Sequence, residues 1–157
     1  MTPAINAAKK AKIPYTVHQY VHDPATGSYG KEAAEKLGLD EARVFKTLVV
    51  ELDDGSLAVG IIPVSAMLGM KLMAKAAGVK KAAMAEKGAV ERSTGYVLGG
   101  VSPLGQKKRL PTFIDSSATD YPTIFVSAGR RGLDIELKPA DLASLTGAKF
   151  AAIREEK

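Results

Sequence analysis

The sequence of 157 residues contains no cysteine. This absence excludes disulfide bonds, Cys-ligated zinc, iron–sulfur clusters and a cysteine nucleophile. Histidine is scarce as well, because only His18 and His22 are present, which is too few for most His-based metal sites. We therefore expect neither a metal ion nor any other cofactor.

Long apolar runs are also missing. No stretch approaches the roughly 20 apolar residues that a membrane span needs, and no long apolar segment follows the start Met1-Thr2-Pro3-Ala4, so a signal peptide is not expected. The composition, 46% hydrophobic and 25% charged, excludes global disorder. We expect a cytosolic, soluble protein without membrane contacts. Its length predicts a single domain over residues 1–157.

The charge balance is mildly basic, with 22 Lys+Arg against 17 Asp+Glu and a net charge of +5. Cations cluster at Lys80-Lys81, Lys107-Lys108-Arg109 and Arg130-Arg131. Such clusters can line a track for phosphates, although charge runs also occur simply as solvated faces. Few aromatic residues lie between the cations, so stacking of many bases is not expected. Contact with one end of an RNA fits better than binding in a groove, and DNA is not an expected partner.

Hairpins and helices are mixed along the chain, which predicts an α+β fold with a largely antiparallel or mixed sheet. The clearest hairpin joins strands 45–52 and 57–62 through Asp53-Asp54-Gly55-Ser56. Both strands are almost continuously Val, Ile and Leu, so both faces should be buried. Thr2 followed by Pro3 predicts a helix start. Further helices are expected at 4–11, 31–37, 71–77, 86–93 and 139–146, further strands at 15–21, 83–84, 112–115, 123–127, 133–137 and 149–153, loops or turns at 22–27 and 128–132, and a brief turn over 40–43.

Lys46 opens an otherwise apolar strand, Thr47-Leu48-Val49-Val50. A lysine beside such a run either extends its ammonium to the surface or lies in a pocket with a partner. An ordinary edge lysine fits the pattern, and so does a cation at a pocket mouth that faces an anionic or carbonyl group.

The glycine loop, Leu98-Gly99-Gly100-Val101-Ser102-Pro103-Leu104-Gly105, is a second candidate site. Paired glycines allow backbone N–H groups to approach a ligand and to bind anions or carbonyl oxygens. The spacing matches neither a P-loop nor a dinucleotide fingerprint. A plain turn is the alternative.

Three polar residues lie at or in predicted strands. Tyr20 and Ser127 can donate hydrogen bonds and Asp134 can accept them, although each alone fits a structural role. Neither histidine has a Ser or Cys partner at motif spacing, so a catalytic triad is not expected.

The glycine loop and its flanks resemble one known family. The segments that carry the resemblance are Lys46-Thr47-Leu48, Ser93-Thr94-Gly95-Tyr96-Val97-Leu98-Gly99-Gly100-Val101-Ser102-Pro103-Leu104-Gly105-Gln106-Lys107-Lys108-Arg109-Leu110-Pro111-Thr112, the opening Met1-Thr2-Pro3-Ala4, His22-Asp23-Pro24, and the late Val126-Ser127-Ala128-Gly129-Arg130-Arg131-Gly132-Leu133-Asp134-Ile135-Glu136-Leu137. They resemble the YbaK family of Cys-tRNA(Pro) deacylases, which are related to the editing insertion of bacterial prolyl-tRNA synthetases. The resemblance covers essentially the whole chain.

The resemblance implies a mixed, mostly antiparallel sheet that curls toward a barrel and is flanked by helices. It implies a trans-editing enzyme that removes cysteine from the 3′ end of mischarged tRNA(Pro), with prolyl-tRNA synthetase as a transient partner. Lys46 falls on the essential lysine of the family. The other positions around the aminoacyl-adenosine end are Tyr20, Gly99, Ser127 and Asp134, with Thr47 in the same shell. The departure is Ala128, where many relatives carry glycine.

The implied mechanism is assisted by the substrate, whose own thiol attacks the aminoacyl carbonyl. Binding alone separates side chains of similar size only about 10–200-fold, so a second sieve is needed after cysteine is misactivated. The protein then supplies orientation and electrostatics: N–H groups of the loop from Gly99 through Gly100 to Ser102 hold the carbonyl oxygen, and Lys46 adds positive potential beside the terminal nucleotide. Tyr20, Ser127 and Asp134 bind the ribose hydroxyls and the α-amine. Two other functions stay open, a non-catalytic RNA- or nucleotide-binding module and a docking partner of the synthetase. The sequence does not indicate an oligomeric state.

Overall fold

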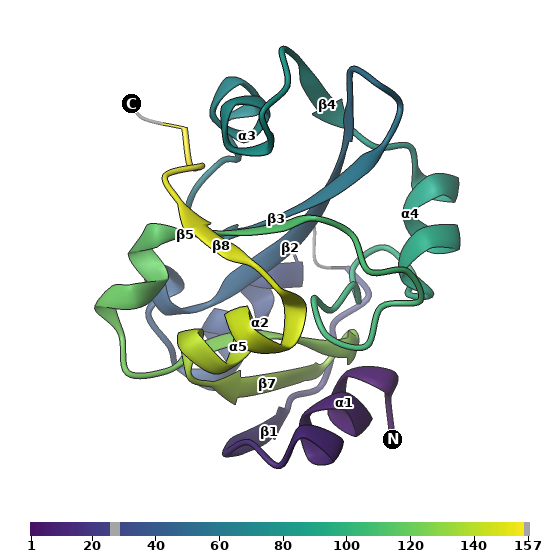
Figure 1. Cartoon of the computed structure of the whole chain (residues 1–157). Coiled ribbons are helices and arrows are strands. Elements are labelled where there is room, and N and C mark those ends of the chain that lie inside the picture. The colour runs from purple at the N-terminus through teal and green to yellow at the C-terminus, as the bar shows by residue number, and fades with distance from the viewer. Residues whose placement is uncertain (26–28, 156–157) are drawn as a thin grey trace.

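The computed structural model describes residues 1–25 and 29–155, whose strands form two sheets (Figure 1). The three-stranded sheet is antiparallel throughout, in the order β1 (Tyr15–Gln19), β7 (Leu133–Leu137), β6 (Ile124–Arg130). The five-stranded sheet has the order β4 (Ala82–Met84), β2 (Phe45–Leu52), β3 (Leu57–Pro63), β5 (Thr112–Asp115), β8 (Lys149–Ala151). In it, β4, β2 and β3 pair antiparallel, whereas β3, β5 and β8 pair parallel.

The two sheets meet just before β2. Val44 forms a parallel bridge with Phe125 of β6, and both side chains are almost fully buried. On its other side, the Val44 carbonyl accepts a 2.8 Å hydrogen bond from the Val64 N–H, directly after β3. The start of β2 is therefore attached to both sheets.

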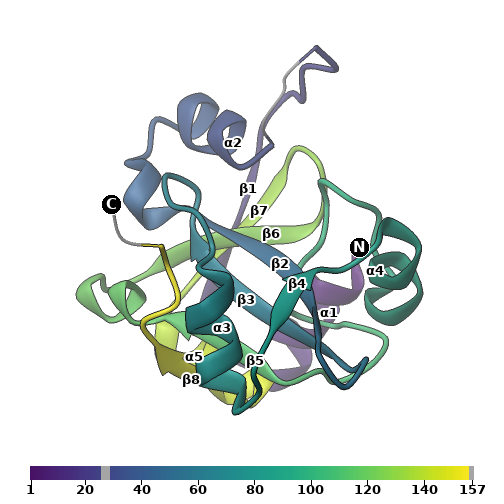
Figure 2. The ribbon, with the colours of Figure 1, turned by 90° about the horizontal axis from the view of Figure 1, so that it is seen from above.

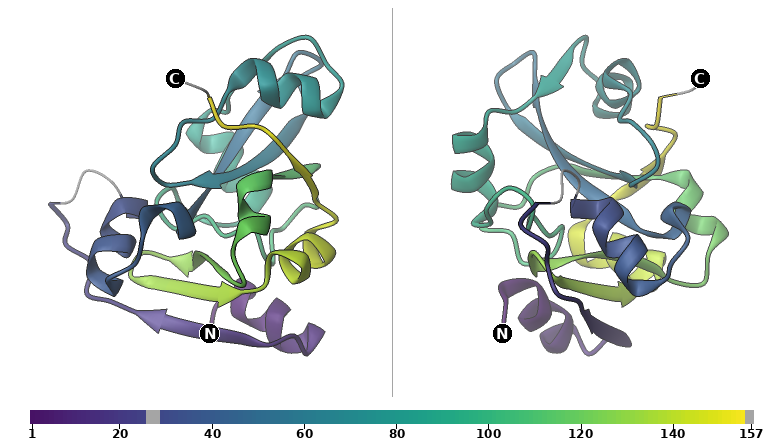
Figure 3. Two further views of the ribbon diagram at one scale, coloured as in Figure 1. Left: turned by 90° about the vertical axis from the view of Figure 1, so that its left-hand side faces the viewer. Right: turned by 180° about the vertical axis from the view of Figure 1, so that it is seen from behind.

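Helices cover the outer faces of this pair of sheets. Seen from above and from behind, α2 lies over the region where the two sheets meet (Figures 2 and 3). Helix α3 packs its Met73 against the five-stranded sheet, and α1 contacts β6. The helices are α1 (Pro3–Ala11), α2 (Tyr29–Leu37), α3 (Met70–Ala77), α4 (Lys87–Thr94) and α5 (Pro139–Thr146), with 3-10 turns η1 (Glu41–Arg43) and η2 (Ser116–Asp120).

The first helix shows how a local signal is tied to the tertiary fold. The Thr2 hydroxyl accepts a 3.2 Å hydrogen bond from the Ile5 N–H, and Pro3 occupies the first turn, which confirms the predicted helix start. The same hydroxyl donates to the Ala128 carbonyl of β6. Ile5 and Ala8 are buried in the main core cluster, so α1 is fixed against the three-stranded sheet.

Most of the central hairpin is buried, as its apolar sequence predicts, although Glu51 near the turn is exposed. Every residue of β3 from Ala58 onward is buried. In β2, by contrast, the three residues from Lys46 to Leu48 are only half-buried, between buried Phe45 and buried Val49. This break in the burial of a central strand marks the wall of a cavity.

The α+β class, the helices, and the mixed, mostly antiparallel pairing are confirmed. The strands divide between two sheets, and residues 1–25 and 29–155 form no closed barrel. The turn predicted at 128–132 is wrong in extent: β6 continues to Arg130 through a bulge after Ser127, which leaves only Arg131 and Gly132 between the strands. The turn η2 was not predicted. Residues 26 and 27 of the predicted loop 22–27 lie outside the described residues.

Val59 in β3 offers a test of the core. We expect Val59→Ala to lower the free energy of unfolding by about 2 kcal/mol, because its side chain is 0% exposed and its two lost methyl groups leave a cavity. The control Val21→Ala removes the same atoms from a side chain that is 83% exposed and should change stability by less than about 0.5 kcal/mol. Urea denaturation measures both, and equal effects would contradict this assignment of the core.

Candidate active site

A cavity of about 220 Å³ lies at the meeting point of the two sheets. Strand β2 supplies one wall, β6 and β7 supply a second, and α2 and the glycine loop close it from outside. Six of the eight residues predicted for the site line this cavity: Tyr20, Lys46, Thr47, Gly99, Ser127 and Asp134. They come from four separate parts of the chain, so only the tertiary fold brings them together.

Pairing within the three-stranded sheet positions one group of these residues. Ser127 of β6 lies directly opposite Asp134 of the central strand β7. Tyr20 follows β1 on the other side of β7, and its N–H donates a 3.0 Å hydrogen bond to the Gly132 carbonyl. The hydroxyls of Tyr20 and Ser127 are thus carried by the strands on either side of the Asp134 carboxylate.

Asp134 is a buried carboxylic acid at the cavity wall. Its side chain is 5% exposed, and no hydrogen bond within residues 1–25 and 29–155 reaches its carboxylate. Burial raises the pKa of Asp134 to about 7, because a charge is poorly solvated there. Burial and the nearby Asp134 charge also raise the pKa of Tyr20 to about 12, so the phenol remains a proton donor at neutral pH. Asp134, in contrast, changes charge close to neutrality.

Lys46 enters the cavity from β2 as a half-buried cation. It lies outside the segment of β2 that pairs with β4, and within the described chain no acidic side chain lies within ion-pair distance of it. Burial and the positive charge of Lys31 lower the pKa of Lys46. The neighbouring Thr47 hydroxyl is buried without a hydrogen-bond partner among the described residues. Unsatisfied polar groups destabilise a fold, and their concentration in one cavity is typical of a binding or catalytic site.

The glycine loop contributes one residue of its predicted set to the cavity. Gly99 lines it with a φ of +89°, which favours glycine, and the Gly100 N–H closes a turn to the Val97 carbonyl at 3.0 Å. Gly100 itself lies against β6, where a Cβ atom would stand 2.8 Å from Cα of Arg130. Ser102 is fully buried, and its hydroxyl accepts a 3.2 Å hydrogen bond from the Leu104 N–H. The structure thus places Gly100 and Ser102 behind the cavity wall, where they shape the loop.

Two further polar residues, which were not predicted individually from the sequence, also line the cavity. Tyr29 begins α2, and Arg130 ends β6. Arg130 belongs to a cation pair seen in the sequence, which was a usable signal. No local sequence pattern pointed to Tyr29, because its place at the cavity depends on how α2 packs over the region where the two sheets meet. Next to them, the guanidinium of Arg131 stacks over the Tyr29 ring at 4.2 Å from its centroid.

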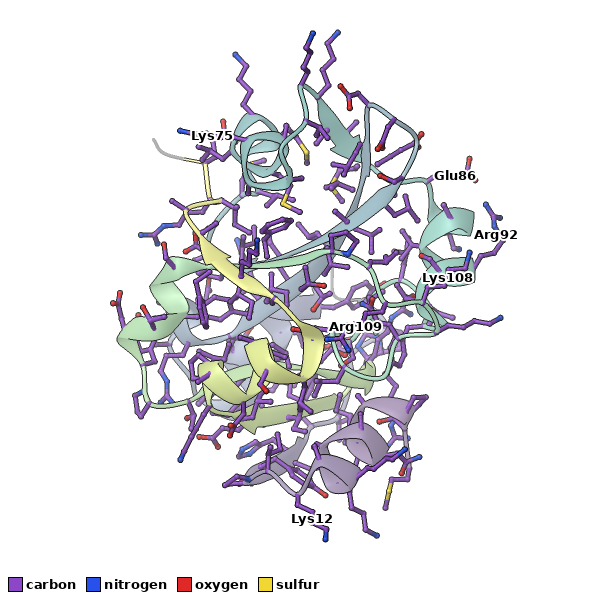
Figure 4. All side chains as sticks on the ribbon, viewed as in Figure 1. Lys12, Lys75, Glu86, Arg92, Lys108 and Arg109 are labelled. Atoms are coloured by element: carbon purple, nitrogen blue, oxygen red, sulfur yellow. The ribbon has the colours of Figure 1, made fainter. Side chains whose placement is uncertain are left out.

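The cation clusters do not form one continuous track. The Lys108 N–H donates a 2.9 Å hydrogen bond to the Ser93 carbonyl near the end of α4. Arg109 instead packs at the end of α5, where a Cβ on Gly147 would lie 2.6 Å from Arg109 Nη2. Figure 4 shows Arg92 and Lys108 at one side of the molecule, Arg109 near the middle of the view, and Lys75 and Lys12 at opposite ends. Lys80 and Lys81 lead into β4, away from the cavity.

The histidines lie outside the cavity, and each makes a hydrogen bond with a glutamate. His18 Nε2 is 2.9 Å from Glu136, and His22 Nδ1 is 2.7 Å from the buried Glu32. Within residues 1–25 and 29–155 there is no group of three acidic or histidine side chains that could hold a metal ion. In the same part of the chain, no helix has the length and apolar character needed to span a membrane.

Comparison with known proteins decides the family. The model of the aminoacyl-tRNA editing domain matches residues 23–145. The chain belongs to the aminoacyl-tRNA editing domain family. The resemblance to the YbaK family is therefore confirmed, and the matched segment contains all but Tyr20 of the predicted site residues. The cavity described above is the candidate active site of this editing domain.

Relatives and solved structures agree with this placement. The editing domain is 40% identical over 152 residues to a protein of Enterococcus faecalis provisionally named Cys-tRNA(Pro)/Cys-tRNA(Cys) deacylase EbsC, covering 97% of this chain and 92% of that one. It is also similar to the crystal structure of hypothetical protein APE2540, with a TM-score of 0.87, 26% identity, and coverage of 98% and 100%. A structure provisionally described as a trans-editing enzyme for prolyl-tRNA synthetase shares the fold, with a TM-score of 0.81, 23% identity, and coverage of 99% of both chains.

Asp134 should make the stability of the editing domain depend on pH. Its pKa is about 7 when folded and roughly 3.9 when unfolded, so between these values the folded state holds a proton that the unfolded state has lost. Wild-type stability is then highest below the unfolded pKa, falls as the pH rises toward 7, and levels off above it. Asp134→Asn cannot ionise. We therefore expect its free energy of unfolding, relative to that of wild type, to rise by on the order of 2–4 kcal/mol as the pH goes from 4 to 8.

Urea denaturation of both proteins across that pH range measures the difference. A constant difference between wild type and Asp134→Asn would show that the carboxyl titrates alike in both states. Asp54→Asn is the control, because this exposed carboxylate lies in the distant β2–β3 turn and should leave the slope between pH 5 and pH 8 unchanged.

Proposed function

We propose that this editing domain is a trans-acting deacylase that hydrolyses Cys-tRNA(Pro), the product of cysteine mischarging by prolyl-tRNA synthetase. The observation that carries the proposal is one cavity with a half-buried lysine, a buried carboxyl and a glycine turn, but no histidine: Lys46, Asp134 and Gly99. Lys46 has no ion-pair partner among the described residues. The family supports it, and so does the name of the Enterococcus faecalis relative. Such a cavity can orient and polarise a substrate, but it offers no conventional nucleophile with its base.

The reaction begins with the thiol of the esterified cysteine. Its sulfur attacks the aminoacyl carbonyl, and a new C–S bond forms as the C–O bond to the tRNA ribose breaks. The thiol proton ends on the ribose oxygen that leaves, so no redox partner is needed. Water then opens the cyclic thioester to free cysteine. Because the chain contains no cysteine, the only thiol in the site belongs to the substrate.

Residues of the cavity bind and orient this substrate. We assign the N–H of Gly99 to the carbonyl oxygen, where negative charge develops, and Lys46 to the phosphate and ribose side of the terminal adenosine. Ionised Asp134 binds the α-ammonium group, and Tyr20 and Ser127 bind the ribose hydroxyls. The Thr47 hydroxyl, which no other described residue binds, is available for the same group of contacts. Gly100 and Ser102 support the loop from behind.

The partners follow from the substrate. The 3′ end of mischarged tRNA(Pro) enters the cavity, and prolyl-tRNA synthetase is a transient partner that delivers it. We place the reaction in the cytoplasm, where tRNA is charged, and assign it to the 157 residues acting as one editing domain. The exposed Arg130 at the cavity supplies positive charge for the phosphates.

A comparison of three aminoacylated forms of tRNA(Pro) tests the proposed reaction. We expect the protein to release cysteine from Cys-tRNA(Pro) while leaving Pro-tRNA(Pro) and Ala-tRNA(Pro) near their uncatalysed rates, since neither proline nor alanine carries a thiol. Loss of labelled amino acid over time measures each rate. No acceleration with Cys-tRNA(Pro) would leave a binding module or a docking protein, and equal acceleration with the alanyl ester would exclude the thiol mechanism.

Lys46→Ala separates catalysis from folding. We expect kcat/KM for Cys-tRNA(Pro) to fall at least ~100-fold, because the cation inside the cavity is lost. The melting temperature should change by only a few degrees, since no ion pair of the described residues breaks. Lys75→Ala on the exposed face of α3 removes the same charge and should retain activity. Unfolding of Lys46→Ala at room temperature would instead make this lysine structural.

A further inference from the structure

The peptide bond between Leu98 and Gly99 lies at the centre of a tight turn. The Gly100 N–H donates to the Val97 carbonyl at 3.0 Å, and Gly99 has a φ of +89°, as the third residue of a type II turn requires. With glycine at this position, a type I turn is also accessible, in which this central peptide is turned over. The local sequence therefore does not determine which way the peptide points.

Arg131 determines it from a different part of the chain. Its Nη2 donates a 2.8 Å hydrogen bond to the Leu98 carbonyl oxygen, 33 residues earlier in the sequence. The guanidinium carbon lies over the Tyr29 ring, 4.2 Å from its centroid. A Cβ atom on Gly99 would stand 2.5 Å from Arg131 Nε and 2.6 Å from Tyr29 Cε2, so the turn, the arginine and the ring are in close contact.

The hydrogen bond on the carbonyl also sets the direction of the N–H. In a trans peptide the C=O and N–H bonds point in opposite directions. With the Leu98 oxygen directed at exposed Arg131, the Gly99 N–H points away from the arginine, and no acceptor within the described residues takes it up. Gly99 lines the cavity, whereas Arg131 does not. If the peptide turned over, the carbonyl oxygen would take the place of this donor.

We propose that Arg131 is a positioning residue, which fixes the Leu98–Gly99 peptide through the Leu98 carbonyl and thereby keeps the Gly99 N–H available to the ester carbonyl of the substrate. This inference rests on the proposed function, because it gives the N–H its catalytic partner. Arg131 acts through the turn and through Tyr29, and it need not touch the aminoacyl group. Arg130, which directly precedes Arg131 in the chain, supplies positive charge for the phosphates instead.

Two substitutions separate the hydrogen bond from the charge. Arg131→Met keeps a long side chain against Tyr29 but loses every donor, whereas Arg131→Lys keeps a charged donor that can reach the Leu98 carbonyl. We expect Arg131→Met to lower the single-turnover rate with saturating Cys-tRNA(Pro) by about 10- to 100-fold, short of the full loss of an oxyanion donor, with KM changed less than threefold. Arg131→Lys should recover most of the rate. Lys75→Gln, equal in charge change, should behave as wild type.

A phosphate-binding role would give the opposite pattern. In that case, KM rises for both Arg131→Met and Arg131→Lys, the salt dependence of tRNA binding weakens, and the single-turnover rate is unchanged. That result would overturn the proposal. So would equal losses in rate for the Met and Lys variants, since the lysine retains a donor.

NMR of the free protein tests the peptide orientation without any substrate. We expect the Gly99 amide resonance to shift and broaden in Arg131→Met, as the peptide samples both orientations, and to stay near its wild-type position in Arg131→Lys. An unchanged Gly99 resonance in Arg131→Met would show that the turn holds its orientation alone. If wild type fails to deacylate Cys-tRNA(Pro), the proposed function and the catalytic role of Arg131 both fall, while this measurement still decides whether Arg131 fixes the turn.

Discussion

The backbone bridge between Val44 and Phe125 holds the two sheets together at the point where the cavity forms. Both residues are buried, and the chain continues from Val44 directly into β2. At this end of β2 the partner strand β4 is absent, so Lys46 and Thr47 face a space that the second sheet, α2 and the glycine loop enclose. The candidate active site thus lies where the two sheets meet, and there polar groups can be enclosed without being satisfied by either sheet.

The enclosed polar groups support the proposed function, in which the substrate brings its own nucleophile. Burial of Lys46 and of Asp134 disfavours the charged form of each, so a ligand that offers an anion to the lysine and an ammonium to the carboxylate gains more here than in water. No thiol of the protein competes with the substrate thiol. In this proposal the protein contributes geometry and electrostatic potential. The Thr47 hydroxyl, buried without a hydrogen-bond partner among the described residues, is one polar group that a substrate could satisfy.

Local patterns predicted much of the fold because their physical causes are local. The Thr2 cap and the hairpin turn at Asp53–Ser56 are each formed by hydrogen bonds between neighbouring residues, and both are present. The extent of β6 could not be predicted, because the bulge near Gly129 exists only where β7 pairs with it. The division into two sheets is likewise a result of long-range pairing. The parallel pairs of β3, β5 and β8 join segments far apart in the chain, and no local signal reports them.

The sequence by itself determined the residue types of the site, the family and the absence of a protein thiol. Six of the predicted residues line one cavity, so the motifs alone predicted most of the candidate site. Tertiary structure alone decided which residues face it: Gly100 and Ser102 lie behind the wall, whereas Tyr29 and Arg130 reach it. It also decided the surroundings of the Leu98–Gly99 peptide, because the Leu98 carbonyl accepts its hydrogen bond from Arg131, which is distant in sequence.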